Sequence, residues 1–429
     1  MRICIVGKYP PIQGGVSKET YYTCHELAKR GHQVSVVTNC FEVEDDFRVL
    51  MRDSDHKQLE GQYENGEVKV YATSTMLVGN HIPMSNPFVS KMIGTATEVA
   101  KGCDVIVGWY LEPYGVVATI VGSILRKPVL LRHAGSDIGR LSDNPDLAKT
   151  YSLLMEKASG VITRTPLNER LIALGLNEEK LIQGRPSCLV PNFSKGHPFP
   201  DPELIDASKE RFLSGKLPEK IRGRLSSRLN ESPDPDIPTI GIYGKVGGVK
   251  GSYDLINALS RLAEQGVKFN FLSLVGGRHP GLSRYLNTIL EMPALAEKTL
   301  ILPFIAPWRV PDFLGACQAT CFLERDFPIT FHTPQVPREI LASGSSLVLS
   351  REIANKQNFS DSLVDSKNVI LVDPKDNDDL RKKLKILLTD QDLLRSVGYH
   401  GGCLSRIWEG QFASRSGMAD AIESFSLGT

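Results

Sequence analysis

Two lysines stand in a glycine-rich segment, YGKVGGVKGSYDLINAL, whose residue types suit the binding of a diphosphate. Lys245 comes at the end of an apolar run that is expected to be a strand, and Lys250 comes just before an expected helix. Two ammonium groups converging there would neutralise the charge of a diphosphate as a nucleotide leaves. The alternative is a flexible, solvated basic loop, and the position at a strand end favours the functional interpretation.

A glycine pair forms a second candidate site near the start of the chain. Gly14 and Gly15 follow the first apolar run, and the segment SKETYYTCHELAKRG after them has a helical pattern with Ser17 as the expected N-cap. Glycines let the backbone approach a ligand closely, and free N–H groups at a helix N-terminus attract phosphate or another anion. The spacing is not G-x-G-x-x-G, so a simple tight turn is an equally good explanation.

Polar and aromatic side chains follow two further apolar runs. In LLRHAGSDI, His133 is expected where a strand ends, and a histidine there could hydrogen-bond substrate or act as an acid or base. A structural histidine is the alternative. Asp137, a few residues on, is a possible contact to the sugar or the acceptor. Trp109 and Tyr110 end the run before it and could stack on a sugar, although packing in the core or a loop also explains them.

An acidic residue in a short C-terminal helix supplies the fourth candidate. Glu339 falls in the first turns of a helical pattern that ends at Gly344. A carboxylate in that place could accept hydrogen bonds from the two hydroxyls of a ribose, as in dinucleotide-binding folds, or it could simply favour the helix dipole. The stretch before it, which contains His332 and Thr333, could offer backbone N–H groups to a donor phosphate.

The elements that would position these residues alternate between strand and helix. Helical patterns separate most of the apolar runs, and the continuously apolar strands favour parallel sheets covered on both faces. The expected strands lie at 2–7, 34–39, 68–73, 104–110, 128–135, 160–165 and 188–192, and then at 239–245, 271–277, 299–304, 319–324, 345–350 and 369–374. Expected helices include 17–31, 115–125, 203–213, 282–291 and 336–343.

The fold plan therefore occurs twice, and the composition changes between the two halves. We predict an N-terminal Rossmann-like domain over 1–192, a Pro-, Ser- and charge-rich linker or insertion over 193–238, a C-terminal Rossmann-like domain over 239–407, and a segment 408–429 that packs back on the first domain. Doubly wound sheets bind ligands at the carboxyl ends of their strands. Two such domains would face each other across an interdomain cleft.

The overall composition excludes several classes of function. The 429 residues carry a net charge of +1, which gives no global basic field for nucleic acid. Eight scattered cysteines lack C-x-x-C pairs and are expected to be reduced. The N-terminus is expected to be a strand rather than a signal peptide, and no apolar stretch is long enough to cross a bilayer. We expect a cytoplasmic protein that is soluble or at most peripheral at the inner membrane face.

In this order, the segments resemble the retaining glycosyltransferases of family 4, which have the GT-B fold. The resemblance covers nearly the whole chain, although each motif is loose. The matching segments are Gly14–Gly15, RHAGSDI at 132–138, VPNF at Val190–Phe193, GKVGGVKG at 244–251 and REILASG at 338–344.

The resemblance implies a role for each candidate. The Gly14–Gly15 loop would approach the donor phosphates and the acceptor, and His133 would contact the transferred sugar. Lys245 and Lys250 would bind the diphosphate and stabilise it as the leaving group, and Glu339 would hold the ribose. The donor would be a UDP- or GDP-sugar, and the acceptor a hydroxyl of a sugar, a lipid-linked sugar or a small molecule.

The sequence departs from the family pattern in two places. The usual arginine is Lys245, which keeps the charge and loses the bidentate fork. The first glutamate of the paired-glutamate motif, eight residues before Glu339, is Phe331. Glu324 and Asp326 lie upstream and could replace it only if the loop is rebuilt. His332 and Thr333 could instead supply polar contacts to the sugar.

The implied reaction is glycosyl transfer with retention, in polysaccharide, glycolipid or glycoconjugate biosynthesis. We expect no metal or cofactor, because lysines and helix N-termini can stabilise the leaving phosphate. The D-P-D sequence at 234–236 lies in the proline-rich segment and is not expected to bind metal. Two alternatives stay open: a nucleotide-sugar epimerase or hydrolase of the same fold, and a catalytically degenerate binding protein, which the phenylalanine in place of the glutamate would favour.

Overall fold

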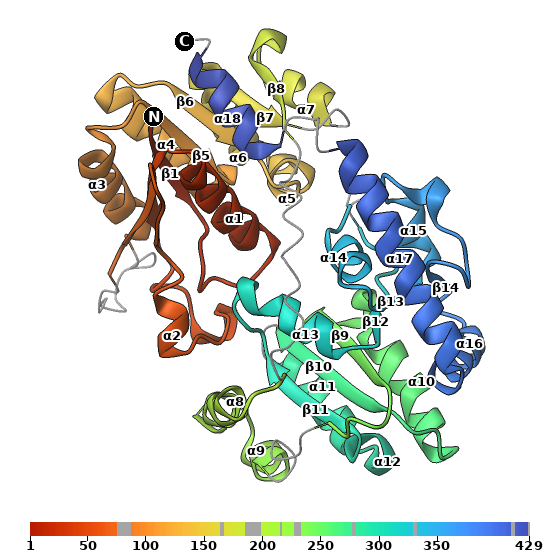
Figure 1. Cartoon of the computed structure of the whole chain (residues 1–429). Helices are drawn as coiled ribbons and strands as arrows, with labels where there is room; N and C mark the ends of the chain where they lie inside the picture. The colour runs from red at the N-terminus through yellow and green to blue at the C-terminus, as the bar shows by residue number, and fades with distance from the viewer. Residues whose placement is uncertain are drawn as a thin grey trace. The chain divides into compact units, whose positions relative to one another are not determined.

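The computed structural model describes residues 1–74, 87–163, 167–184, 199–214, 217–226, 233–276, 280–328, 333–412 and 417–427. The chain divides into two compact units, Met1–Leu189 with Ala413–Thr429, and Val190–Phe412 (Figure 1). Each contains one sheet with helices around it. The strand predicted at 188–192 lies outside the described residues, as do Phe331 and His332.

The first unit contains an eight-stranded sheet in the order β3-β4-β2-β1-β5-β6-β7-β8. All neighbouring strands are parallel except the short edge strand β3, which pairs with β4 in the antiparallel sense. Buried apolar residues fill the central strands, as expected of a sheet covered on both faces. The strands are β1 Arg2–Gly7, β2 Gln33–Thr38, β3 Gly61–Gln62, β4 Glu67–Ala72, β5 Val105–Trp109, β6 Val129–Arg132, β7 Gly160–Thr163 and β8 Leu181–Gln183.

Most helices of this unit lie between successive strands, and the last one, α18, comes from the C-terminal end of the chain. They are α1 Gly15–Lys29, α2 Asp53–His56, α3 Phe88–Ala100, α4 Val116–Leu125, α5 Ser136–Gly139, α6 Pro145–Lys157, α7 Asn168–Ala173 and α18 Met418–Leu427, with shorter helical turns at Asp45–Phe47, Leu111–Gly115, Leu141–Asp143 and Glu178–Lys180. Local sequence explains where α6 begins. The Asn144 side chain accepts hydrogen bonds from the backbone N–H groups of Asp146 and Leu147, and Pro145 occupies the first turn.

The start of α1 differs from the prediction. Gly14 precedes the helix with φ at 118°, and no side chain caps it. Ser17, the predicted N-cap, lies inside the helix and is buried. The prediction failed because glycine can adopt this backbone conformation at little cost, which allows the helix to begin at Gly15 without a hydroxyl cap.

The second unit contains a six-stranded parallel sheet in the order β11-β10-β9-β12-β13-β14. Its strands are β9 Thr239–Lys245, β10 Asn270–Gly276, β11 Thr299–Pro303, β12 Ala319–Phe322, β13 Ser346–Ser350 and β14 Ile370–Val372. The first strand of the unit, β9, lies between β10 and β12, and successive strands are then added outward on both sides. This is the doubly wound arrangement that the alternating sequence predicted.

The helices of the second unit include two that fall in the Pro-, Ser- and charge-rich segment. These are α8 Pro202–Ser214, which packs against β11, and α9 Glu219–Ser226. The others are α10 Ser252–Glu264, α11 Gly281–Leu290, α12 Pro293–Ala296, α13 Val310–Ala316, α14 Val336–Ser343, α15 Arg351–Asn355, α16 Asn377–Thr389 and α17 Gln391–Phe412, with turns at Gly248–Lys250, Pro307–Arg309 and Ser360–Ser362. Asp376 caps α16 through the N–H groups of Asp378 and Asp379.

The C-terminal helix α18 belongs to the first unit and packs against α1 (Figure 1). Arg30, directly after α1, contacts Asp420 at 2.6 Å and Glu423 at 2.7 Å. His32 also contacts Glu423, at 2.7 Å.

The cysteines in the described part of the chain are free thiols, and all of these except Cys403 are buried. Within the described residues, no helix is both long and apolar enough to cross a membrane.

A buried histidine in the first unit makes stability depend on pH. His25 on α1 packs against Tyr21 with ring centroids 4.2 Å apart, and its Nδ1 lies 2.6 Å from the hydroxyl oxygen of Tyr63. Burial lowers the pKa of His25 to about 4, because the charged imidazolium would lose its hydration.

We therefore expect acid to destabilise the protein through His25. His25 takes up a proton near the ordinary pKa of about 6.5 in the unfolded state, but only near 4 in the folded state. The stability that the neutral, buried His25 gives the folded state is therefore fully present above about pH 6.5 and is lost as pH falls towards 4. Between about pH 7 and pH 5 this group should remove about 2 kcal/mol of unfolding free energy. Urea unfolding of the wild type and of His25→Gln at both pH values tests this. Parallel pH profiles for the two proteins would contradict it.

Candidate functional site

The carboxyl edge of the second sheet brings the two predicted lysines to one place. Lys245 is the last residue of β9, the strand from which the sheet grows in both directions. Such a reversal of strand order is where doubly wound sheets bind ligands. Lys250 ends the helical turn Gly248–Lys250, directly before α10. The pKa of Lys245 lies below its usual value, because surrounding atoms desolvate the ammonium group and because the positive charge of Lys250 is near.

Gly251 sets the distance between this loop and the neighbouring strand β12. Its φ is 68°, and a Cβ at this position would lie 2.3 Å from the carbonyl oxygen of Leu323. The N–H of Arg325 donates to the carbonyl oxygen of Val249 at 2.9 Å. The lysine loop and the segment after β12 are therefore in direct backbone contact.

The segment after β12 carries an acid that contacts Lys250. Glu324 is 5% exposed, and its carboxylate forms an ion pair with the Lys250 ammonium group. The ammonium nitrogen also lies 4.3 Å from the ring centroid of Phe327. From sequence, Glu324 was only a substitute for the missing glutamate in a rebuilt loop, and its pairing with Lys250 was not foreseen. The available signal was an acid placed directly after an apolar run, next to the strand that ends in Lys245.

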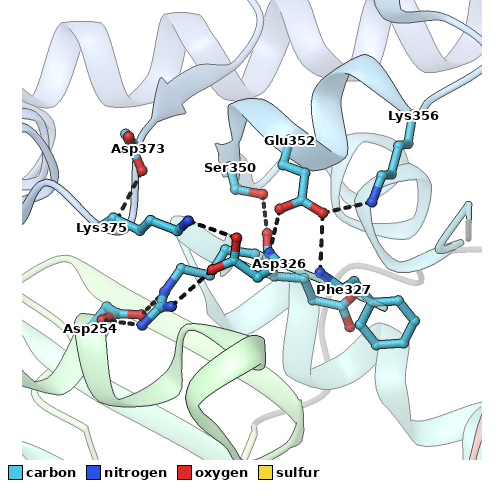
Figure 2. A network of polar contacts seen from close by, with 10 residues as sticks. Asp254, Asp326, Phe327, Ser350, Glu352, Lys356, Asp373 and Lys375 are labelled. Carbon is cyan, nitrogen blue, oxygen red and sulfur yellow. Dashed lines mark hydrogen bonds and ion pairs between the residues drawn. The ribbon is translucent and has the colours of Figure 1, made fainter. Parts of the chain in front are cut away.

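Polar contacts fix the backbone of this segment on two sides (Figure 2). The Glu352 carboxylate at the start of α15 accepts hydrogen bonds from the N–H groups of Asp326, at 2.5 Å, and Phe327, at 3.3 Å. On the other side, the Arg325 guanidinium binds both carboxylate oxygens of Asp254 on α10, at 2.9 and 3.2 Å. A bidentate pair of this kind restrains orientation as well as distance.

Further contacts reach the same segment from β13 and from the loop after β14. The Ser350 hydroxyl donates to the carbonyl oxygen of Glu324 at 2.6 Å, and Lys375 contacts the Asp326 carboxylate at 2.7 Å (Figure 2). Asp326 adopts a positive φ of 51°, a conformation that aspartate tolerates better than most residues. The position of Glu324 is thus determined by its own backbone rather than by the flexible lysine.

Glu339 lies in the first turn of α14, as the sequence predicted, and is 7% exposed. Its carboxylate accepts a hydrogen bond of 2.5 Å from the hydroxyl of Tyr243 in β9. Tyr243 packs edge-on against Phe313 with ring centroids 5.7 Å apart, which orients the hydroxyl. The sequence does not predict the contact of Tyr243 with Glu339, because a tyrosine within an apolar strand is expected to pack in the core. Thr333 precedes α14 and is partly exposed.

In the first unit, the predicted polar residues His133 and Asp137 both follow β6, the first directly and the second in α5. His133 is 1% exposed, and its Nε2 lies 3.1 Å from the hydroxyl oxygen of Thr163. Asp137 is fully buried and accepts hydrogen bonds from the backbone N–H groups of Leu111, Ala134 and Ile138. Burial raises the pKa of Asp137, and these N–H groups counteract the rise. Its carboxylate holds two loops together, which is a structural task.

The aromatic pair after β5 separates into two environments. Trp109 is fully buried, which agrees with the alternative that it packs in the core. Tyr110 is partly exposed, has a φ of 84°, and its hydroxyl oxygen lies 2.9 Å from that of Ser136. The Lys8 ammonium lies 4.5 Å from the centre of the Tyr110 ring, a cation–π contact that the sequence did not indicate.

A buried ion pair joins α1 to the end of β6. Arg132 contacts the Glu19 carboxylate at 3.2 Å, and both side chains are buried. Gly14 and Gly15 begin the same helix, and no heavy atom outside their chain neighbours lies within 4 Å of the place where a Cβ of either glycine would be. Among the described residues, no three His, Cys, Asp or Glu side chains gather in a way that could hold a metal ion.

Comparison with known proteins identifies the fold of the chain. No protein-family model and no curated protein matches the sequence. Anabaena HepE, crystallised with UDP-glucose, matches the structure with a TM-score of 0.61 at 15% identity, over 100% of this chain and 99% of HepE. Sucrose-phosphate synthase from Thermosynechococcus elongatus gives 0.55 at 16% identity, over 100% and 98%. A Rickettsia africae glycosyltransferase gives 0.54 at 14% identity, over 99% and 97%. The predicted GT-B fold, with two parallel-sheet α/β domains, is thereby confirmed.

The contact between Gly251 and β12 can be tested by substitution. Gly251→Ala should lower the unfolding free energy by about 2–4 kcal/mol, because the added methyl group meets the Leu323 carbonyl oxygen and the backbone has a positive φ. Gly266→Ala is a matched control, since its φ is 77° and the methyl group would meet nothing within 4 Å. That variant should lose only about 1 kcal/mol. If denaturant unfolding showed the same loss of unfolding free energy in both variants, the close approach of Gly251 to Leu323 would not contribute to stability.

Proposed function

We propose that the protein is a retaining glycosyltransferase of family 4 that transfers a sugar from a UDP- or GDP-sugar to a hydroxyl acceptor. The observation that carries this proposal is that Lys245 and Lys250 both lie where the strand order of the second sheet reverses, near enough for the charge of Lys250 to lower the pKa of Lys245. Two cations at that edge suit the diphosphate of a nucleotide-sugar. The fold shared with HepE, which was crystallised with UDP-glucose, supports the same assignment.

In the proposed reaction, the protein stabilises the departing diphosphate rather than forming a bond itself. The acceptor oxygen attacks the anomeric carbon on the face that the diphosphate leaves, so the configuration is retained. Lys250 and Lys245 meet the negative charge that grows on the leaving oxygen, and a fixed positive charge there lowers the barrier. This step assigns the charge stabilisation to lysines and needs no metal.

The remaining roles follow the family pattern residue by residue. Glu339 is proposed to hold the ribose hydroxyls, and its buried carboxylate, already oriented by Tyr243, is well placed to accept hydrogen bonds. His133 is proposed to contact the transferred sugar, and the Gly14–Gly15 start of α1 to approach phosphate through its N–H groups. Tyr110, which the family pattern does not include, is partly exposed and is proposed as an acceptor or sugar contact.

The chemical class of the proposed acceptor indicates the biological setting. A hydroxyl acceptor on a sugar, a lipid-linked sugar or a small molecule fits a role in polysaccharide, glycolipid or glycoconjugate synthesis. We propose that the protein acts in the cytoplasm, where nucleotide-sugars are made, with peripheral contact to the inner membrane face if the acceptor is lipid-linked.

Incubation with a panel of UDP-, GDP- and ADP-sugars tests the activity. Slow release of a nucleoside diphosphate, with transfer to an added acceptor, is the expected result, and NMR of the new linkage should show the anomeric configuration of the donor. Epimerised donor without any acceptor would identify an epimerase instead. Tight binding without turnover would identify a binding protein, and no binding to any member would refute the proposed function.

The leaving-group role of Lys250 gives a quantitative prediction. Lys250→Met should lower turnover about 100- to 1,000-fold, because the charge that stabilises the leaving diphosphate is lost. The same change at Lys382, an exposed lysine on α16, should leave turnover unchanged and serves as the control. Steady-state release of nucleoside diphosphate measures both, and equal rates in the two variants would remove Lys250 from the reaction.

A further inference from the structure

The ion pair between Glu324 and Lys250 places a negative charge inside a site proposed to bind a diphosphate. The Glu324 side chain is 6% exposed, whereas that of Lys250 is 23% exposed. A buried carboxylate loses its hydration and depends on a partner for its stability in the ionised form. An anion that binds Lys250 must therefore share or replace a partner that the ammonium group already has.

The two members of the pair differ in freedom of movement. The carbonyl oxygen of Glu324 accepts the Ser350 hydroxyl, and the next residue, Arg325, is bound through both its backbone and its side chain. Lys250 has a long, flexible side chain at the start of α10 and touches Phe327 through a non-directional cation–π contact. Binding of an anion would therefore move the lysine ammonium, while the carboxylate stays where its backbone holds it.

We propose that Glu324 is a built-in counter-ion of the phosphate site. It holds the Lys250 ammonium when no nucleotide is bound, and the ammonium is exchanged to the diphosphate when the donor binds. This inference rests on the proposed function, since it assumes that the site takes a diphosphate. No covalent bond changes in the exchange: Lys250 keeps its proton and positive charge, and only its hydrogen-bond acceptor changes.

The exchange has consequences for which ligands bind and how they leave. A ligand must offer Lys250 more negative charge than one carboxylate does, so a diphosphate competes well and a neutral nucleoside or a weakly charged group does not. After transfer, Glu324 can take the ammonium back from the nucleoside diphosphate, which helps the product to dissociate. The carboxylate thereby weakens ground-state binding of every anion at the site.

Glu324→Gln provides the test, because glutamine keeps the shape and can still accept a hydrogen bond from Lys250 but carries no charge. Isothermal titration of wild type and variant uses inorganic pyrophosphate, which has neither base nor sugar, and then UDP, GDP and ADP. We expect the variant to bind pyrophosphate, and the nucleoside diphosphate that the wild type accepts, at least about tenfold more tightly, since a like charge near the phosphates is removed. Uridine, guanosine and adenosine, which are uncharged, should show no such gain.

Asp326→Asn is the matched control. It removes one negative charge from the same segment, at an exposed carboxylate that contacts Lys375 rather than Lys250. It should leave pyrophosphate affinity within about twofold of the wild type, because exposed charges are screened. If Asp326→Asn gained as much pyrophosphate affinity as Glu324→Gln, a change in net charge alone would explain the tighter binding, and the proposal would be overturned.

Folding and binding effects are separated by a second set of variants. Lys250→Met alone should lower the thermal midpoint, because it leaves the Glu324 carboxylate buried without its cation, and adding Glu324→Gln should restore much of the loss. Unchanged or weaker pyrophosphate and nucleotide binding in folded Glu324→Gln overturns the counter-ion role while leaving the proposed function intact. If neither protein binds pyrophosphate or any nucleotide, both the proposed function and this inference fall.

Discussion

The backbone contact between the lysine loop and the end of β12 is the constraint on which the site in the second unit depends. Because Gly251 has no side chain, the loop can approach the Leu323 carbonyl just after β12, and the next residue, Glu324, then reaches Lys250. A larger residue at 251 would separate the two segments and leave a buried carboxylate without its cation. Charge placement in this protein therefore follows from a steric requirement of the backbone.

The same strand plan is used differently in the two units. In both sheets the first strand of the unit lies where the order reverses, β1 between β2 and β5, and β9 between β10 and β12. The edge beside β9 has two lysines, whose mutual repulsion helps to lower the pKa of Lys245. In the first unit, Arg132 is neutralised by buried Glu19, and the buried Asp137 is used to hold backbone. Lys250 is likewise paired with buried Glu324, so the second sheet differs in having a further cation, Lys245, at the same edge, which supports the proposal that the donor diphosphate binds there.

The sequence was sufficient for most of the strands, although it missed β3 and β8, and it was insufficient for the contacts of the site residues. The strands at 2–7 and 239–245 and the helix at 336–343 were predicted with the bounds that the structure has, because parallel strands are apolar throughout and Gly344 ends the helix. Ser17 was misassigned because a glycine with positive φ can begin a helix without a capping side chain. Trp109 was read as a strand-end residue, yet whether a ring at a strand end faces the core or solvent depends on what packs over it, which spacing alone does not contain.

Glu324 shows why a motif-based interpretation misses part of a site. The family pattern directs attention to the position eight residues before Glu339, which is Phe331 here, and treats the absence of an acid there as a loss of function. The acid that the structure brings to Lys250 is 74 residues away in sequence. Ser350 holds its backbone carbonyl, and Asp254 and Glu352 hold the residues that follow it; none of the three belongs to the motif. A carboxylate fixed by backbone contacts resists the movement that would let it follow a ligand. In the proposed reaction its negative charge repels the phosphates of the bound donor and of the nucleoside diphosphate product alike, so other contacts hold the donor and the product dissociates readily.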